Sequence, residues 1–185
     1  MKKLILSLLV AAFVGGNTLS AQTITKNEDG KYSLSVGHVT LTVDAQKGGK
    51  IVSYRYDDKE ILSQTKIPNS FGSTFWTSPQ SEWNWPPVPE YDTKPFNAEV
   101  AGDKLILTGE KSKRFGYRVR KELTTDKKDN AIVITYTIIN ESGETRKVAP
   151  WEISRVPNGG ILFFDAKEVT PANNMETMPF VYEKK

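Results

Sequence analysis

The 185-residue chain has no cysteine and only one histidine, His38. The absence of cysteine excludes a disulfide framework, a lipid-anchor cysteine after a signal and a thiol nucleophile. One histidine cannot supply the usual zinc or iron ligand sets. Ser-His-Asp or Cys-His catalysis would depend on this one histidine, and we do not expect it. His38 stands at the head of a predicted strand, and we interpret it as a structural residue. The sequence therefore predicts no metal and no cofactor.

Long apolar runs are almost as scarce. The one such run, Leu4–Gly16, follows Met1-Lys2-Lys3 and precedes the polar stretch Asn17–Ala21. It is too short to span a bilayer, and this order of segments is typical of a signal peptide. We expect residues 1–21 to be removed by cleavage after Ala21. The sequence then predicts a bacterial periplasmic or secreted protein with no membrane span.

A strong charge of either sign is also missing. Without Lys2 and Lys3, 23 basic and 22 acidic side chains leave a net charge of +1. This balance does not indicate a nucleic acid or an anionic membrane as a partner. One locally basic cluster is interpreted as a solvated hairpin and the outer face of a strand: Lys111, Lys113, Arg114, Arg118, Arg120 and Lys121.

Helical periodicity is absent too, and alternation with a period of two takes its place. Apolar and polar residues alternate in Tyr32–Val36, Val39–Val43 and Tyr117–Leu123, each typical of a strand with one buried face. Ala131–Ile139 is apolar on both faces, which predicts a central strand covered on both sides. Further short strands are expected at 50–56, 97–101, 104–108, 147–156, 161–164 and 180–182. The class is all-β, an antiparallel β-sandwich spanning residues 22–185.

One segment, Phe71–Pro89, is unusually rich in tryptophan and proline. It contains three of the four tryptophans, Trp76, Trp83 and Trp85, among four of the ten prolines. Dense proline disfavours a helix interior or a central strand, so we expect a long ordered loop. Two interpretations remain open: the indoles form a small core that fixes the loop, or they present apolar faces to a ligand such as a sugar.

A second block, Ala149–Pro157, places a tryptophan and two charged residues in one predicted strand. Alternation puts Trp151 and Arg155 on one face and Glu152 on the other. A charged residue on an inner face must be paired or bind a ligand. Arg155 either pairs with a carboxylate and braces the sheet, or it joins Glu152 at the floor of a cleft beside the tryptophan loop, where both bind sugar hydroxyls.

These two blocks, N-S-F-G-S-T-F-W-T-S-P-Q with W-N-W-P-P and later A-P-W-E-I-S-R-V, resemble an uncharacterised family of secreted bacterial proteins. That family is similar to the galactose mutarotase (aldose 1-epimerase) superfamily, and the resemblance covers about residues 30–182. It implies a β-supersandwich with a carbohydrate ligand on its concave face, or mutarotase-like chemistry. By this resemblance the possible ligand contacts are Trp76, Gln80, Trp83, Trp85, Trp151, Glu152 and Arg155.

The resemblance carries over no catalytic residue. Mutarotation needs a base and an acid, and mutarotases use a late glutamate and mid-chain histidines. His38 lies too early to match, and by this resemblance the late glutamate would fall beyond Lys185. We therefore expect Lys185 to mark a truncation, so that the chain is the N-terminal part of a supersandwich. Unpaired strand edges would then favour self-association.

Three functions follow from these observations. The first is a carbohydrate-binding protein without catalysis. The second is an aldose epimerase-like or other sugar-processing enzyme that uses carboxylates without histidine; a glycosidase would need two facing carboxyl groups. The third is an envelope scaffold or interaction module in which the tryptophans are buried.

Overall fold

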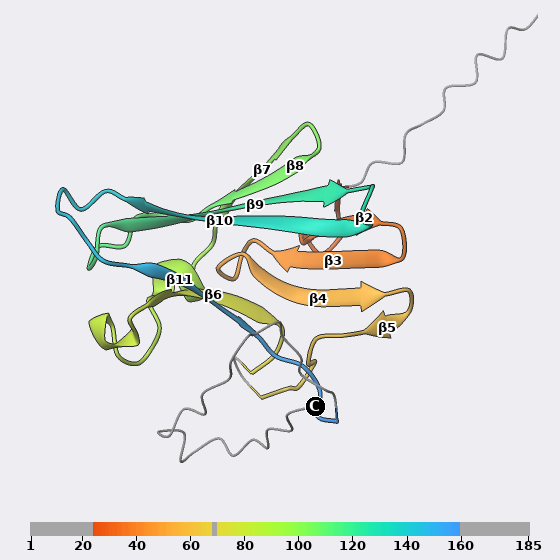
Figure 1. The fold of residues 1–185 in the computed structure, drawn as a ribbon, viewed down its shortest axis with the longest axis horizontal. Helices are drawn as coiled ribbons and strands as arrows, with labels where there is room; N and C mark the ends of the chain where they lie inside the picture. Colours follow the sequence, from red (N-terminus) through yellow and green to blue (C-terminus); the bar gives the residue numbers. More distant parts are fainter. Residues whose placement is uncertain (1–23, 68–69, 160–185) are drawn as a thin grey trace, which may run out of the picture.

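The computed structural model describes residues 24–67 and 70–159. The predicted signal peptide and the strands expected at 161–164 and 180–182 lie outside these ranges. The described chain forms two antiparallel sheets packed face to face, one of seven strands and one of four (Figure 1). The prediction of an all-β antiparallel sandwich is therefore confirmed.

The larger sheet has the strand order β1-β2-β3-β4-β6-β11, with β5 paired to β4. Its strands β1 to β4 lie side by side in sequence order because short turns connect them as hairpins. The pair β6–β11 crosses this meander obliquely in Figure 1 and joins β4 through a single register pair, Ile51 opposite Ser73. The strands are β1 (Ile24–Lys26), β2 (Tyr32–Val36), β3 (Val39–Asp44), β4 (Lys50–Tyr56), β5 (Lys59–Glu60), β6 (Ser73–Ser78) and β11 (Ala149–Ser154).

The smaller sheet has the order β10-β9-β8-β7, in which each strand pairs with its neighbour in sequence. Its strands are β7 (Asn97–Ala101), β8 (Lys104–Thr108), β9 (Tyr117–Asp126) and β10 (Ala131–Asn140). Between β6 and β7 the chain makes a 3₁₀ turn, η1 (Gln80–Glu82), and one short helix, α1 (Pro89–Asp92). Proline fits the first helical position of α1 because a backbone N–H at that position would have no intrahelical acceptor, so its absence costs nothing.

The core lies between the two sheets and is built by alternation. In β2 and β3 the residues with inward side chains include Leu34 and Leu41, which are at most 4% exposed. In β9 the sequence Y-R-V-R-K-E-L buries Tyr117, Val119 and Leu123, as predicted, and Arg118, Arg120 and Glu122 lie on the other face. Each such apolar side chain contributes about 1.5–3 kcal/mol on burial.

Two structural predictions need correction. Residues 73–78 form strand β6 and are not part of a loop, because the first proline of the segment Phe71–Pro89 is Pro79 and S-T-F-W-T-S before it is free to pair. Strand β10 is not central in the described chain but lies at one end of its sheet. Its outward Val133 is 43% exposed, so apolar residues on both faces did not mean cover on both faces.

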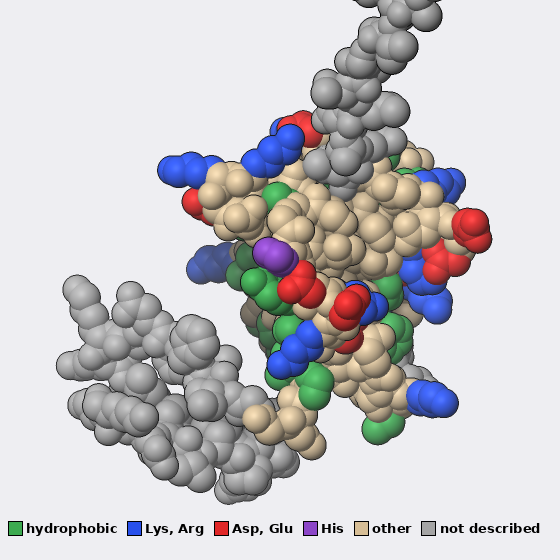
Figure 2. Space-filling view, turned by 90° about the vertical axis from the view of Figure 1, so that its right-hand side faces the viewer, with side chains coloured by type: hydrophobic (Ala, Val, Ile, Leu, Met, Phe, Trp, Pro, Cys, Tyr) green, Lys and Arg blue, Asp and Glu red, His purple; other side chains and the backbone are tan. Residues whose placement is uncertain are grey.

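The end of the molecule where β2 turns into β3 shows charges of both signs interspersed. Figure 2 looks onto this end, where the single histidine stands beside acidic and apolar side chains. His38 Nδ1 lies 2.7 Å from Asp57 Oδ1, and its ring stacks on Tyr56 at 5.5 Å between centroids. These contacts join the β2–β3 turn to the β4–β5 turn.

Candidate functional site

The segment between β6 and α1 is anchored by one buried indole. Trp83 follows η1, is 3% exposed, and donates a hydrogen bond from Nε1 to the backbone oxygen of Thr77 at 2.8 Å. Its ring meets Trp76 edge-on at 5.7 Å between centroids. Trp76 is itself 8% exposed on β6. These two rings therefore fix the loop against the sheet, in line with one of the two sequence interpretations.

All four tryptophans meet in one cluster. Trp76 is its centre and meets Trp85 at 6.0 Å and Trp151 at 5.7 Å, both edge-on. Trp151 comes from β11, whose register places it directly opposite Trp76 on β6. Edge-to-face pairs at these distances are favourable beyond the area they bury, by about 0.5–1.5 kcal/mol each. The two tryptophan-bearing segments, far apart in the sequence, thus lie together in space.

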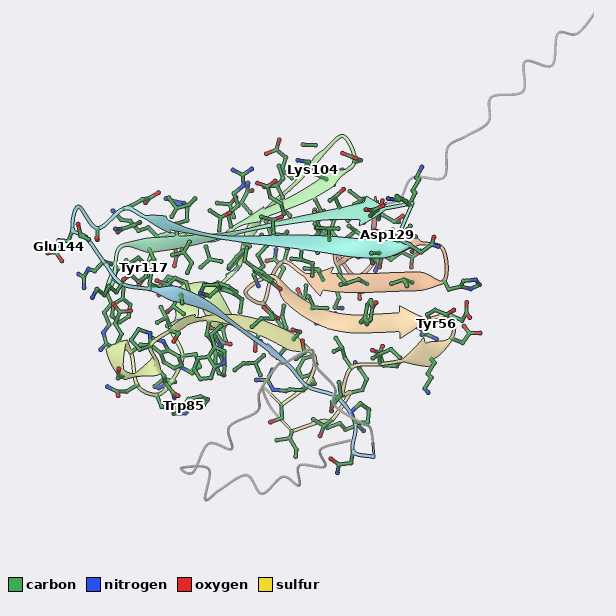
Figure 3. The ribbon with its side chains drawn as sticks, viewed as in Figure 1. Tyr56, Trp85, Lys104, Tyr117, Asp129 and Glu144 are labelled. Atoms are coloured by element: carbon green, nitrogen blue, oxygen red, sulfur yellow. The ribbon has the colours of Figure 1, made fainter. Side chains whose placement is uncertain are left out.

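Trp85 differs from the other three because its ring lies at the surface. It is 67% exposed and projects from the end of the molecule that carries η1 (Figure 3). Beside it is a concavity of about 320 Å³. The residues lining it combine indole and proline surfaces with three charged side chains: Trp83, Trp85, Pro86, Pro87, Val88, Pro89, Glu90, Lys113 and Arg114.

A second concavity, of about 420 Å³, opens on the other flank of the cluster. Its aromatic wall is the half-buried Trp151, and Gln80, Ser78 and Ser81 provide amide and hydroxyl groups. Pro79 and Pro150 complete the lining together with Ala149. Of the seven residues predicted as ligand contacts, Trp83 and Trp85 line the first concavity, and Gln80 and Trp151 line the second.

Arg155 lies on the tryptophan face of the sheet, just beyond β11. Its Nη1 donates to Thr74 Oγ1 at 3.0 Å, and its guanidinium lies 5.9 Å from the Trp76 ring centroid. The same indole donates from Nε1 to Asp92 Oδ1 at 2.9 Å, which ties β6 to α1. Burial lowers the pKa of Arg155, while Asp92 and Glu152 oppose that shift. Arg155 lines neither concavity, and its contacts brace the sheet.

Glu152 points to the opposite side of β11, into the space between the sheets, as the alternation predicts. The residue as a whole is exposed along β11, but its carboxylate is partly buried where it accepts a hydrogen bond from Ser73 Oγ. Ser73 Oγ also lies 2.8 Å from Ser154 Oγ. Burial raises the pKa of the Glu152 carboxyl, whereas hydrogen bonds from Ser73 and Tyr136 and the charge of Lys121 act against this shift.

Lys121 is the charged residue that the sequence analysis placed wrongly. It is 3% exposed, and its Nζ donates to the backbone oxygens of Gly48 and Gly49, each at 2.9 Å. Aromatic rings surround the amine, with Phe96 nearest at 5.3 Å to the centroid. Burial lowers the pKa of Lys121 to about 8. The alternation in β9 already indicated that position 121 is buried, because it shares a face with Val119. The charge of the lysine nevertheless suggested a solvated residue.

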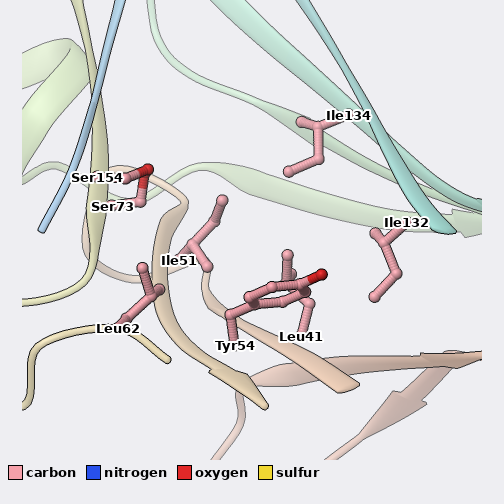
Figure 4. A pocket seen from close by; sticks show the side chains of 8 residues that line it. All are labelled: Leu41, Ile51, Tyr54, Leu62, Ser73, Ile132, Ile134 and Ser154. Carbon is pink, nitrogen blue, oxygen red and sulfur yellow. The ribbon is translucent and has the colours of Figure 1, made fainter. Parts of the chain in front are cut away.

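A third cavity, of about 200 Å³, lies between the sheets near the buried charges. Figure 4 shows Ile132 and Ile134 of β10 facing Leu41, Ile51, Tyr54 and Leu62 across it, with Ser73 and Ser154 at one end. It is mostly apolar, and its polar end is formed by the hydroxyls of Ser73 and Ser154, of which that of Ser73 contacts Glu152. Glu152 lines neither this cavity nor the two concavities beside the indoles.

Within residues 24–67 and 70–159 no group of three or more histidine, cysteine, aspartate or glutamate side chains is placed to hold a metal ion. In the same ranges no helix has the length and apolar character needed to cross a membrane.

No protein-family model matches the chain. No curated protein sequence matches it either. Among solved structures, it is similar to part of a 4-alpha-glucanotransferase from Thermococcus litoralis, with 15% sequence identity and a TM-score of 0.40. The similar region covers 62% of this chain but only 23% of that enzyme. A similarity this weak establishes neither a family nor an activity.

Proposed function

We propose that this protein binds carbohydrate at the tryptophan cluster and does so without catalysis. The protein is periplasmic or secreted, has a mutarotase-like sandwich, and loses its signal peptide by cleavage near Ala21. The ligand is a mono- or oligosaccharide whose ring lies on an exposed indole. Polar groups beside that indole bind its hydroxyls.

The observation that carries the proposal is the exposure of Trp85. An indole that is 67% exposed loses the benefit of burial, yet its backbone is stiffened by Pro86 and Pro87 and its ring is backed by Trp76. Ligand sites typically combine aromatic walls with a few convergent polar groups, and aromatic residues dominate binding energy where they are rigid. The concavity beside Trp85 has this composition. The one beside Trp151 supplies hydroxyl and amide partners.

Binding is favoured over catalysis by the position of Glu152. It is the carboxyl group of this region whose pKa is raised, which suits an acid–base role. Its side chain, however, points between the sheets, on the other side of β11 from Trp151. A sugar on the indoles would be separated from this carboxyl by the strand itself. A general acid must reach its substrate directly or through one water molecule.

Titration of the full chain with a panel of glycans tests the proposal, with tryptophan fluorescence and calorimetry as the readouts. We expect at least one saccharide to bind, and Trp85→Ala to lower its affinity about tenfold or more, since aromatic contacts supply much of the binding energy. Tyr56→Ala is the matched control, because Tyr56 is 54% exposed at the opposite end of the molecule (Figure 3). If no saccharide binds, the scaffold interpretation takes its place.

Polarimetry separates binding from the epimerase alternative. Fresh α-glucose or α-galactose is mixed with the protein, and the decay of optical rotation is compared with a buffer blank. We expect equal rates. A faster decay that Glu152→Gln abolishes would replace the binding proposal with an enzyme.

A further inference from the structure

The concavity beside Trp85 has an uneven charge distribution. Its only carboxylate belongs to Glu90, whose side chain is 11% exposed and whose Oε1 lies 3.0 Å from Lys94 Nζ. Lys94 also contacts Glu110, which does not line the concavity, so this amine is shared between two acids. The one negative charge of the wall is therefore already paired with a cation that does not line the concavity.

The two cations of the same wall have no carboxylate in direct contact in the described ranges, although Lys113 acts on Glu110 at longer range. Lys113 and Arg114 are exposed, and neither forms an ion pair with any residue in the described ranges. Exposed cations beside a low-dielectric aromatic wall concentrate anions near it. From the sequence both residues were expected in a solvated hairpin, because nothing in the local sequence places them beside Trp85.

Arg114 is also held in position. Its Nη2 donates to the backbone oxygen of Glu82 at 3.2 Å, and its guanidinium carbon lies 4.8 Å from the Phe115 ring centroid. A guanidinium has five N–H donors, and in the described structure this backbone oxygen is the one acceptor that Arg114 meets. A fixed planar fork with unused donors suits the paired oxygens of a carboxylate or sulfate.

We propose that the saccharide bound beside Trp85 is anionic. Its sugar ring lies on the indole, and a carboxylate or sulfate group on that ring contacts Lys113 and Arg114. This inference rests on the proposed function and narrows it to acidic glycans. Uronate and sulfate esters present the same chemistry to this wall, namely a fixed negative charge shared by paired oxygens, and the experiment distinguishes them.

Matched ligands isolate the charge. The full chain is titrated with a short oligogalacturonate, with its fully methyl-esterified form and with a sulfated galactan oligosaccharide. Esterification removes the charge and keeps the ring. We expect the uronate or the sulfated ligand to bind at least about tenfold more tightly than the neutral ester, with affinity that falls as salt rises. Whichever of the two acids binds more tightly identifies the anionic group.

Matched variants locate the contact. Lys113→Gln and Arg114→Gln are expected to weaken binding of the acidic ligand about tenfold each and to leave the ester unchanged. Lys104→Gln removes one positive charge at the β7–β8 turn, away from Trp85, and is expected to have no effect (Figure 3). Trp85→Ala is expected to weaken acidic and neutral ligands alike.

Three results would overturn the inference. Equal affinity for acid and ester, with Trp85→Ala still harmful, rejects the anionic ligand and keeps the proposed carbohydrate function. Acid binding that survives Trp85→Ala is ionic attraction without a sugar site and rejects the inference. Failure of every saccharide rejects both.

Discussion

At the scale of single residues, Lys121 shows how a buried charge can be retained. Its amine contacts two backbone oxygens, those of Gly48 and Gly49, rather than a carboxylate. The acids that act on it at longer range are Glu152 on β11 and Asp92 on α1, and Tyr136 faces it from β10. Burial still dominates, because these contacts replace water only in part.

The lowered pKa of Lys121 predicts a stability that rises with pH. Below pH 8 the amine is protonated in both states; between about 8 and its ordinary value of 10.5, only the unfolded chain binds the proton. Stability rises with pH wherever the unfolded state binds more protons. We expect the free energy of unfolding to increase by about 2–3 kcal/mol between pH 8 and pH 10 in urea titrations.

Lys121→Met is the control for this prediction, since it removes the titrating amine and keeps most of the side-chain volume. The variant is expected to lose the rise. Above about pH 10 the raised pKa values of Tyr91 and Tyr136 act in the opposite direction, because the folded state then holds protons that the unfolded state releases. An equal slope in both proteins would assign the rise to other groups.

At the scale of elements, the loop after β6 carries two tryptophans with different roles: Trp83 is buried and fixes the loop, and Trp85 is exposed. Trp83→Ala removes a buried ring and leaves the Thr77 oxygen without its donor, so we expect a loss of about 3–5 kcal/mol in unfolding free energy. Trp85→Ala removes an exposed ring and should change stability by only about 0.5 kcal/mol. Urea denaturation measures both. Equal losses would mean that Trp85 is part of the core.

The turn between β3 and β4 is expected to be equally intolerant of change. Gly48 has φ +64°, and a Cβ there would lie 2.4 Å from the backbone oxygen of Asp92, so α1 packs directly on this turn. We expect Gly48→Ala to cost about 3 kcal/mol or more. Gly102 has φ +63° with no atom within 4 Å of such a Cβ, so Gly102→Ala should cost only the conformational term of about 1–2 kcal/mol. Thermal unfolding of the two variants provides the comparison.

The elements also show what the sequence could predict and where it could not. Alternation identified β2, β3 and β9 because one buried face imposes its period on the residues. It identified the opposite directions of Glu152 and Arg155 for the same reason. It did not identify Lys121 as buried or Arg114 as a neighbour of Trp85, because both depend on contacts between distant segments. Gly48 and Gly49 are more than seventy residues from Lys121.

At the scale of the whole molecule, the two edge strands of the smaller sheet, β7 and β10, differ in character. Strand β7 is five residues long and carries Glu99, whereas β10 is ten residues long, has no charged residue, and pairs only with β9 in the described chain. Long uncharged edges favour pairing with another chain, and natural sheets suppress this with charge. We therefore place the predicted self-association at β10.

Val133→Lys tests this assignment, because Val133 faces outward on β10 and is 43% exposed. A lysine there should keep the fold and raise the monomer fraction at a given concentration, measured by sedimentation velocity, since an edge charge must be desolvated when another strand pairs with it. Val100→Lys on β7 is the matched control, as Val100 is also 43% exposed, and it should leave association unchanged. A wild-type chain that stays monomeric at every concentration and melts in one sharp transition would contradict the assignment. In that case the free edge of β10 is already protected within a single chain.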